Sequence, residues 1–269
     1  MGTTAITNGL AARDSKAPIY YIHTSGTGIL TYGDIDRFTY GELSLKVFDD
    51  WDGVAELTSL PDHAPHRNVD KLVLNAGNLD PALVKTAIVC PPCIYGPGRG
   101  PGNTVSMQIP GLAALTLRQG HGVQVGEGET HWSSVHVQDL SDVYLKLVEA
   151  AAAGGGDASW GAQGYYFAEA GDIVWGEVGK LVAQIAHKHG FIDSEKVVNY
   201  SADEVDAMHA HGSMLWGASS RSKAIRAGRV LGWVPTRPAL EDTVEDSLLI
   251  EAKRLARVPG HAKVAAGDA

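Results

Sequence analysis

The sequence has few cysteines, no long apolar run and no excess of positive charge. Two cysteines among 269 residues cannot form a disulfide framework, which favours a reducing compartment. No uninterrupted apolar run approaches the ~18 residues that span a membrane, and residues 1–16 contain no apolar core of signal-peptide length. We therefore predict a soluble cytoplasmic protein that has no membrane partner.

Acidic residues outnumber basic residues, with 31 Asp and Glu against 22 Lys and Arg. The formal net charge of −9 leaves no basic face for a phosphate backbone, so nucleic acid is not expected as a partner. The hydrophobic content of 44% is typical of a globular protein with a sizeable core.

Strand and helix patterns alternate along the first third of the chain. Residues 18–23 form a β-branched and aromatic run, and residues 84–89 form a second buried strand. Between them, apolar residues at helical spacing predict a helix that begins near Pro65 and ends at Gly77. Because the order is strand, helix, strand, we expect parallel pairing through a crossover, and residues 33–65 are predicted to be a loop.

The rest of the chain contains further periodic segments separated by turn residues. Asp139 is predicted to cap one helix, Ser201 and Glu204 to form a capping box, and Gly126–Gly128 to form a hairpin turn. Short strands are expected at 135–137 and 165–167, and helices at 108–119, 140–153, 178–189, 202–208 and 244–255.

Four segments resemble, in order, those of the extended short-chain dehydrogenase/reductase family, and especially fungal-type epimerase/dehydratase homologues. They are Ile22–Thr27, Pro91–Gly98, Val135–Leu140 and Leu231–Pro235. The resemblance implies a Rossmann-like α/β fold with a three-layer parallel sheet and a small mixed substrate lobe. It also implies an NAD- or NADP-dependent oxidoreductase or epimerase/dehydratase that acts on a small hydroxy or keto metabolite.

The chain departs from this family at its beginning. No glycine-rich dinucleotide-binding turn precedes residue 18, so we expect the sheet to be incomplete at its N-terminal edge, where a homodimer is one way to cover the exposed strand. The expected division is a core of residues 1–98 plus 131–170, a lobe of residues 99–130 plus 171–260, and a tail of residues 261–269.

The second departure concerns the catalytic Y-x-x-x-K motif of the family. Lys71 stands at the lysine position and is expected to contact the cofactor ribose, but Arg67 occupies the tyrosine position. Since arginine stays protonated in proteins, the neighbouring His66 becomes the candidate acid/base. Ser25 or Thr27 would orient a substrate oxygen.

The resemblance also assigns binding residues around the Pro91–Gly98 segment. Pro91, Pro92, Ile94 and Tyr95 are expected beside the nicotinamide. The candidate substrate contacts are Arg99, Asn103 and His136. For His136, a structural role in a strand is an alternative that the pattern favours at least as much. No metal site is expected, because the cysteines and histidines lack a ligand spacing.

Two other functions remain open from the sequence. The Arg67 substitution favours a catalytically silent binding or regulatory protein that keeps the fold. A redox role for Cys90 and Cys93 ranks last, because both lie at a strand end and not at a helix N-terminus.

Overall fold

A parallel sheet of three strands, in the order β1–β3–β7, organises one half of the computed structural model, which describes residues 2–14 and 16–256. The strands are β1 (Ile19–Thr24), β3 (Val84–Cys90) and β7 (Tyr165–Phe167). Ile19 lies opposite Val84, and Ile88 lies opposite Tyr165. The predicted parallel pairing of the first two strands is therefore confirmed.

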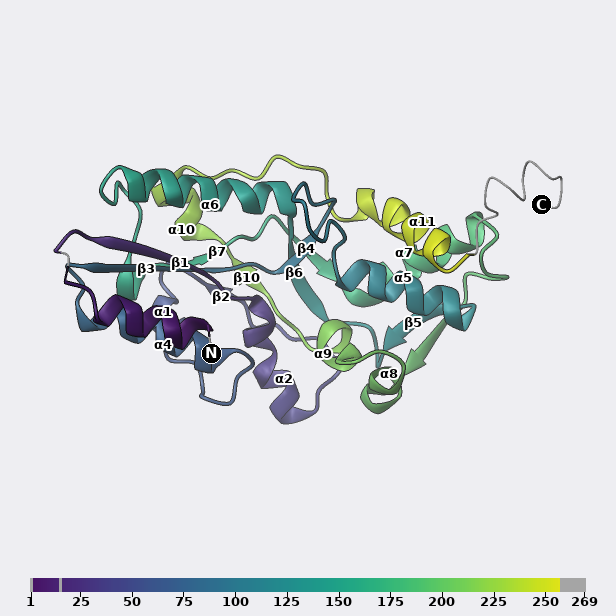
Figure 1. Ribbon diagram of the computed structural model, residues 1–269. Coiled ribbons are helices and arrows are strands. Elements are labelled where there is room, and N and C mark those ends of the chain that lie inside the picture. The colour runs from purple at the N-terminus through teal and green to yellow at the C-terminus, as the bar shows by residue number, and fades with distance from the viewer. Residues whose placement is uncertain (1, 15, 257–269) are drawn as a thin grey trace.

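Helices cover both faces of this sheet and make the three predicted layers. Helices α1 (Gly2–Ala11) and α4 (Arg67–Leu79) lie on one side, and α6 (Val137–Ala152) and α10 (Ile225–Leu231) lie on the other (Figure 1). Strand β3 is buried on both faces: Ile88 and Cys90 pack on the α4 side, and Ala87 and Val89 pack on the α6 side. Such two-sided burial is typical of parallel sheets.

The sheet ends at β1, in agreement with the prediction of an incomplete edge. Within residues 2–14 and 16–256, no strand pairs with the outer edge of β1. The side chains of this strand are mostly half-buried, whereas those of β3 are mostly buried.

A second half contains smaller sheets and the helices packed against them. Strands β4 (Cys93–Tyr95), β6 (His131–His136) and β8 (Gly171–Val174) form one sheet, and β5 (Gly122–Val125) pairs with β9 (Val197–Tyr200). Trp132, Trp175 and Trp216 are buried in its core. Its larger helices are α5 (Gln108–Gln119), α7 (Trp175–Lys188) and α11 (Val244–Arg254).

Short elements complete the described chain. They are η1 (Thr27–Thr31), α2 (Tyr32–Arg37), β2 (Phe48–Asp49), α3 (Val54–Leu57), η2 (Gly161–Gln163), α8 (Ala202–Met208), α9 (Gly212–Gly217), β10 (Ser222–Lys223) and η3 (Glu241–Thr243). The capping box at α8 is confirmed, because Ser201 Oγ accepts from the Glu204 amide and Glu204 accepts from the Ser201 amide.

Two predictions about the first third of the chain were wrong. Residues 33–65 are not a plain loop, since they contain α2, β2 and α3. Gly77 does not end α4 but lies inside it, where a Cβ would overlap Thr86 Oγ1. The glycine therefore lets α4 approach β3 closely. In the sequence, a glycine with this packing role cannot be told from one that ends a helix.

Two predictions near residue 130 were also wrong. Asp139 is not the helix cap: His136 caps α6, and its Nδ1 accepts from the Gln138 amide. Asp139 instead accepts from the amides of Thr236 and Arg237. Gly126–Gly128 forms a turn but no hairpin, because β5 pairs with β9 and β6 pairs with β4 and β8.

The remaining organisational predictions concern the tail, the lobes and the membrane. The predicted tail, residues 261–269, lies outside the described residues, and the predicted domain boundaries stay a prediction. Among the helices of the described residues, none combines the length and the apolar character needed to cross a membrane.

Candidate functional site

A cavity of about 270 Å³ opens at the carboxyl end of β1. In parallel α/β sheets, ligands bind at this edge of the strands. The lining residues come from the end of β1, the turn after it and the first turns of α4: His23, Thr24, Ser25, Gly26, His66, Val69 and Asp70.

Backbone hydrogen bonds hold the turn after β1 in place. The Ser25 amide donates to the Val89 carbonyl at 2.8 Å, and the Thr27 amide donates to the Pro91 carbonyl at 2.9 Å. From the opposite side, Ser220 Oγ donates to the Thr27 carbonyl at 2.6 Å. The wall of the cavity is thus anchored to the end of β3 and to the segment before β10.

The predicted catalytic residues do not all reach this cavity. Ser25 and His66 line it, whereas Thr27 is 1% exposed and is not part of the lining. Lys71 is half-exposed and forms an ion pair of 2.7 Å with Asp62. Its predicted contact with a cofactor ribose stays a prediction.

Arg67 is buried, and its guanidinium donates to the carbonyls of Leu60 and Thr58. These bonds fix the segment that precedes α4. The helix therefore presents His66 and Asp70, which are one turn apart, to the cavity, while Arg67 serves the packing of the chain.

Of the residues expected beside the nicotinamide, Pro91 and Pro92 lie in the connection from β3 to β4, and Ile94 and Tyr95 lie in β4 itself. Pro91 and Pro92 are buried and Ile94 is half-buried. Tyr95 is 4% exposed, and its hydroxyl donates to the Pro238 carbonyl at 2.8 Å. Tyr95 thus ties this connection to the C-terminal part of the chain, and a cofactor contact of these four residues stays a prediction.

The three predicted substrate contacts occupy different surroundings. Arg99 and Asn103 are exposed in the loop after β4, where the Asn103 side chain bonds the backbone of Val105. His136 is 7% exposed, and its ring meets the edge of Tyr95 with 5.4 Å between the ring centres. A substrate contact of these residues stays a prediction.

Both cysteines are free and buried. Burial raises the pKa of Cys93 to about 12, and burial followed by the charge of Asp70 raises the pKa of Cys90 further. Neither is a reactive thiolate near neutral pH. No cluster of three or more His, Cys, Asp or Glu side chains among the described residues is arranged to hold a metal ion.

Asp70, which the sequence did not single out, is the most buried charged group of the cavity. It is 0% exposed, and Tyr165 donates its hydroxyl to Asp70 Oδ2 at 3.1 Å. Burial raises the pKa of the Asp70 carboxyl, and the Ser25 and Tyr165 hydroxyls oppose that shift. Its spacing of four residues from His66 was the one signal available, because two such positions share a helix face.

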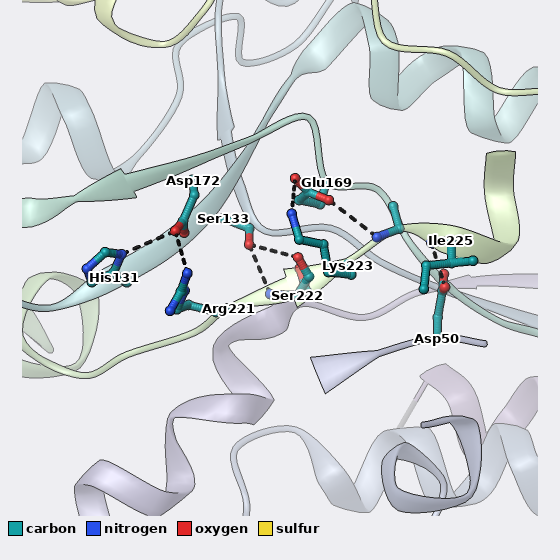
Figure 2. Close-up of polar contacts among 10 residues, drawn as sticks. Asp50, His131, Ser133, Glu169, Asp172, Arg221, Ser222, Lys223 and Ile225 are labelled. Carbon is teal, nitrogen blue, oxygen red and sulfur yellow. Dashed lines mark hydrogen bonds and ion pairs between the residues drawn. The ribbon is translucent and has the colours of Figure 1, made fainter. Parts of the chain in front are cut away.

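Polar contacts along residues 219–226 connect the two halves of the molecule behind the cavity. Figure 2 shows Asp172 between His131 and Arg221, Ser133 bonded to Ser222, and Glu169 facing Lys223. This segment also carries Ser220, so it supports the turn that forms the cavity wall.

The C-terminal end of the same segment contacts a buried carboxylate, that of Asp50. Asp50 accepts from the backbone amides of Phe167, Ile225 and Arg226, and its own carbonyl accepts from the Arg226 guanidinium (Figure 2 draws the Ile225 bond). Asp50 is 0% exposed, and burial raises its pKa from 3.8 to about 6.

This raised pKa predicts a pH-dependent stability. A carboxyl with a raised folded-state pKa contributes stability that is present below pH 3.8 and is lost as pH rises through about 6. We expect the wild type to lose about 2 kcal/mol relative to Asp50→Asn between pH 4 and pH 7. Urea unfolding of both proteins at the two pH values measures this difference in the free energy of unfolding. An equal change with pH in the two proteins would contradict the prediction.

Comparisons with known proteins place this geometry among described folds. No family model matches the chain. The oxidase UcsJ from Acremonium sp. is 36% identical over 259 residues, which cover 94% of this chain and 74% of that protein.

Two solved structures with similar folds cover 94% of this chain. UDP-glucose 4-epimerase from Thermotoga maritima, with UDP-glucose, has a TM-score of 0.59 at 16% identity over 69% of its length. A dTDP-glucose 4,6-dehydratase from Bacillus anthracis, in complex with NAD, has a TM-score of 0.58 at 13% identity over 67% of its length. At these identities the solved structures establish a shared fold.

Proposed function

The chain belongs to the extended short-chain dehydrogenase/reductase family, of the epimerase/dehydratase type, and from this premise we propose that it binds NAD or NADP and acts on a small hydroxy or keto metabolite. The observation that carries the proposal is the cavity at the carboxyl end of β1. The NAD bound by the Bacillus anthracis dehydratase and the oxidase activity in the name of the Acremonium relative support the same class of chemistry.

The residues around the cavity fit the nicotinamide half of the cofactor. A Cβ added at Gly26 would meet nothing within 4 Å, so this wall leaves room for a ring. Ser25 lines the cavity, and its hydroxyl oxygen can accept a hydrogen bond from a ligand. When bound, a nicotinamide ring exchanges a hydride with a substrate carbon.

In this proposal, Ser25 holds the substrate oxygen and His66, which is exposed at the cavity, exchanges a proton with solvent. Lys71 would contact the ribose after it leaves Asp62. Exposed ion pairs of this kind contribute less than about 1 kcal/mol, so the existing pair is a small obstacle.

A second candidate function is a binding protein without turnover. It is favoured by the burial of Arg67 and its bonds to Leu60 and Thr58, because no phenol then occupies the tyrosine position of the family. Dinucleotide binding without substrate-dependent change in nicotinamide absorbance would support this candidate over an enzyme.

Titration of the chain with NADH and NADPH tests the proposal. We expect saturable binding below ~100 μM by ligand fluorescence, with a thermal stabilisation that grows with ligand excess. An absence of both signals at millimolar NADH and NADPH would reject the proposed cofactor.

Gly26→Leu is expected to weaken dinucleotide binding at least about tenfold, which corresponds to roughly 1.4 kcal/mol. The backbone φ of −168° suits any residue and the Cβ position is open, so the fold should be preserved while the side chain fills the cavity. Gly9→Leu, on the exposed face of α1, is the matched control. Equal NADH affinity of Gly26→Leu and the wild type would mean that the dinucleotide does not bind in this cavity.

A further inference from the structure

One buried carboxylate, Asp70, is surrounded by side chains from all three central strands and from its own helix. His23 Nε2 lies 3.8 Å from Asp70 Oδ1, and Tyr165 donates to the other carboxylate oxygen. The titratable or polar groups that face it are His23 and Ser25 from β1 and its end, Arg67 from α4, Cys90 from β3 and Tyr165 from β7.

Two polar atoms of this cluster, Asp70 Oδ1 and Ser25 Oγ, are buried, and neither has a partner at ideal hydrogen-bond geometry. The Ser25 hydroxyl nevertheless lowers the pKa of Asp70 through a side-chain hydrogen bond, so the two groups interact with each other. Both residues line the cavity. A serine that donates to a carboxylate keeps its oxygen lone pairs for a hydrogen bond from a ligand.

The basic side chains nearest in sequence, Lys71 and Arg67, have other partners, and Lys71 pairs with Asp62 at 2.7 Å. The Arg67 guanidinium donates to the carbonyls of Leu60 and Thr58. Within the described part of the chain, the only basic side chain that approaches Asp70 at ion-pair distance is His23. The carboxylate is therefore free to accept a proton or a hydrogen bond from the cavity.

We infer that Ser25, Asp70 and His23 form a proton relay for the hydroxyl group of the substrate. This inference rests on the proposed function for the identity of the substrate as a hydroxy or keto compound. As the alcohol carbon is oxidised, its hydride would pass to the nicotinamide of the dinucleotide that the proposed function names, while the substrate O–H bond breaks and its proton forms a new bond to Ser25 Oγ. The proton that Ser25 carried moves to Asp70 Oδ1, and in the direction of reduction both protons return.

His23 and Asp70 act in this relay as positioning residues, because they reach the substrate through Ser25. Burial raises the pKa of Asp70, which favours uptake of a proton by its carboxylate. Burial also lowers the pKa of His23, and the charge of Asp70 opposes that shift. His66, which is exposed and one helical turn before Asp70, connects the relay to solvent.

The coupling of His23 to Asp70 is testable in the free chain, without cofactor or substrate. We expect Asp70→Asn to lower the His23 pKa by about one unit in an NMR titration of the histidine rings, because an attractive charge is removed. Asp62→Asn is the matched control, because it removes an exposed carboxylate that pairs with Lys71. It should leave the pKa of His23 unchanged. An unchanged His23 titration in Asp70→Asn would overturn the relay.

An alcohol probe tests Ser25 and Asp70 directly. We expect 2,2,2-trifluoroethanol, followed by fluorine NMR at millimolar concentration, to bind the wild type and to lose at least about tenfold in affinity in Ser25→Ala and in Asp70→Asn. Tyr165→Phe, which keeps the carboxylate, should retain binding and guards against loss of folding as the cause. Equal probe binding by all four proteins would overturn the inference.

The two proposals fail separately. If NADH and NADPH do not bind but the alcohol probe and the His23 shift are present, the cofactor is wrong and the relay stands. If the dinucleotides bind and neither relay signal is seen, the proposed function stands and the relay is rejected.

Discussion

Asp50→Ala is expected to lower the free energy of unfolding by about 3 kcal/mol at pH 7. The substitution leaves three backbone amides without an acceptor, those of Phe167, Ile225 and Arg226, all at buried or partly buried positions. Removing one side of a buried polar network costs about 3–5 kcal/mol. We take the low end, because the variant no longer has to bury an ionised carboxylate.

Urea denaturation of the wild type, Asp50→Ala and Asp52→Ala measures this effect. Asp52 is two residues away and exposed, so its removal should change the free energy by less than about 0.5 kcal/mol. A loss below about 1 kcal/mol in Asp50→Ala would mean that the Asp50 network contributes little to holding residues 219–226.

Gly96→Ala is expected to lower the free energy of unfolding by a similar amount, about 3 kcal/mol. Gly96 has a φ of +81°, which costs other residues about 1–2 kcal/mol. The new Cβ would also lie 2.6 Å from Cδ2 of His136 and would overlap Nε2. That ring has little freedom, since Nδ1 accepts from the Gln138 amide and the face meets Tyr95.

Gly100→Ala provides the control from the same loop, because its Cβ would meet nothing within 4 Å and its φ is not positive. The double variant Gly96→Ala/His136→Ala separates the two causes. Relief of the overlap should recover part of the loss, and the backbone term should remain. Thermal unfolding of the four proteins gives the answer, and equal stability of Gly96→Ala and Gly100→Ala would contradict the steric argument.

Elements whose signals are local were predictable from the sequence. Helix α5 and the capping box of α8 lie where periodicity and caps place them, because their hydrogen bonds join residues three or four positions apart. Gly77 shows the limit of such signals: the same glycine that resembles a helix stop serves the contact between α4 and Thr86, nine residues further on.

The candidate site was predictable only in part, because its chemistry depends on contacts between distant residues. Ser25 and His66 were found from the family motifs. Asp70 was missed, since its partner Tyr165 is 95 residues away and a lone aspartate on a helix is ordinarily solvated. The orientation of Lys71 toward Asp62 likewise depends on how the preceding loop folds.

The hydrogen bonds of Asp50 have a consequence for the order in which the chain acquires its structure during synthesis. Its acceptor oxygens serve residues that are 117, 175 and 176 positions further along the chain. Strands β1 and β3 can pair early, but the hydrogen bonds of Asp50 cannot all form until residue 226 has left the ribosome. Contacts of such long separation form slowly, so Asp50 stays hydrated and without its three amide partners for most of the synthesis of the chain.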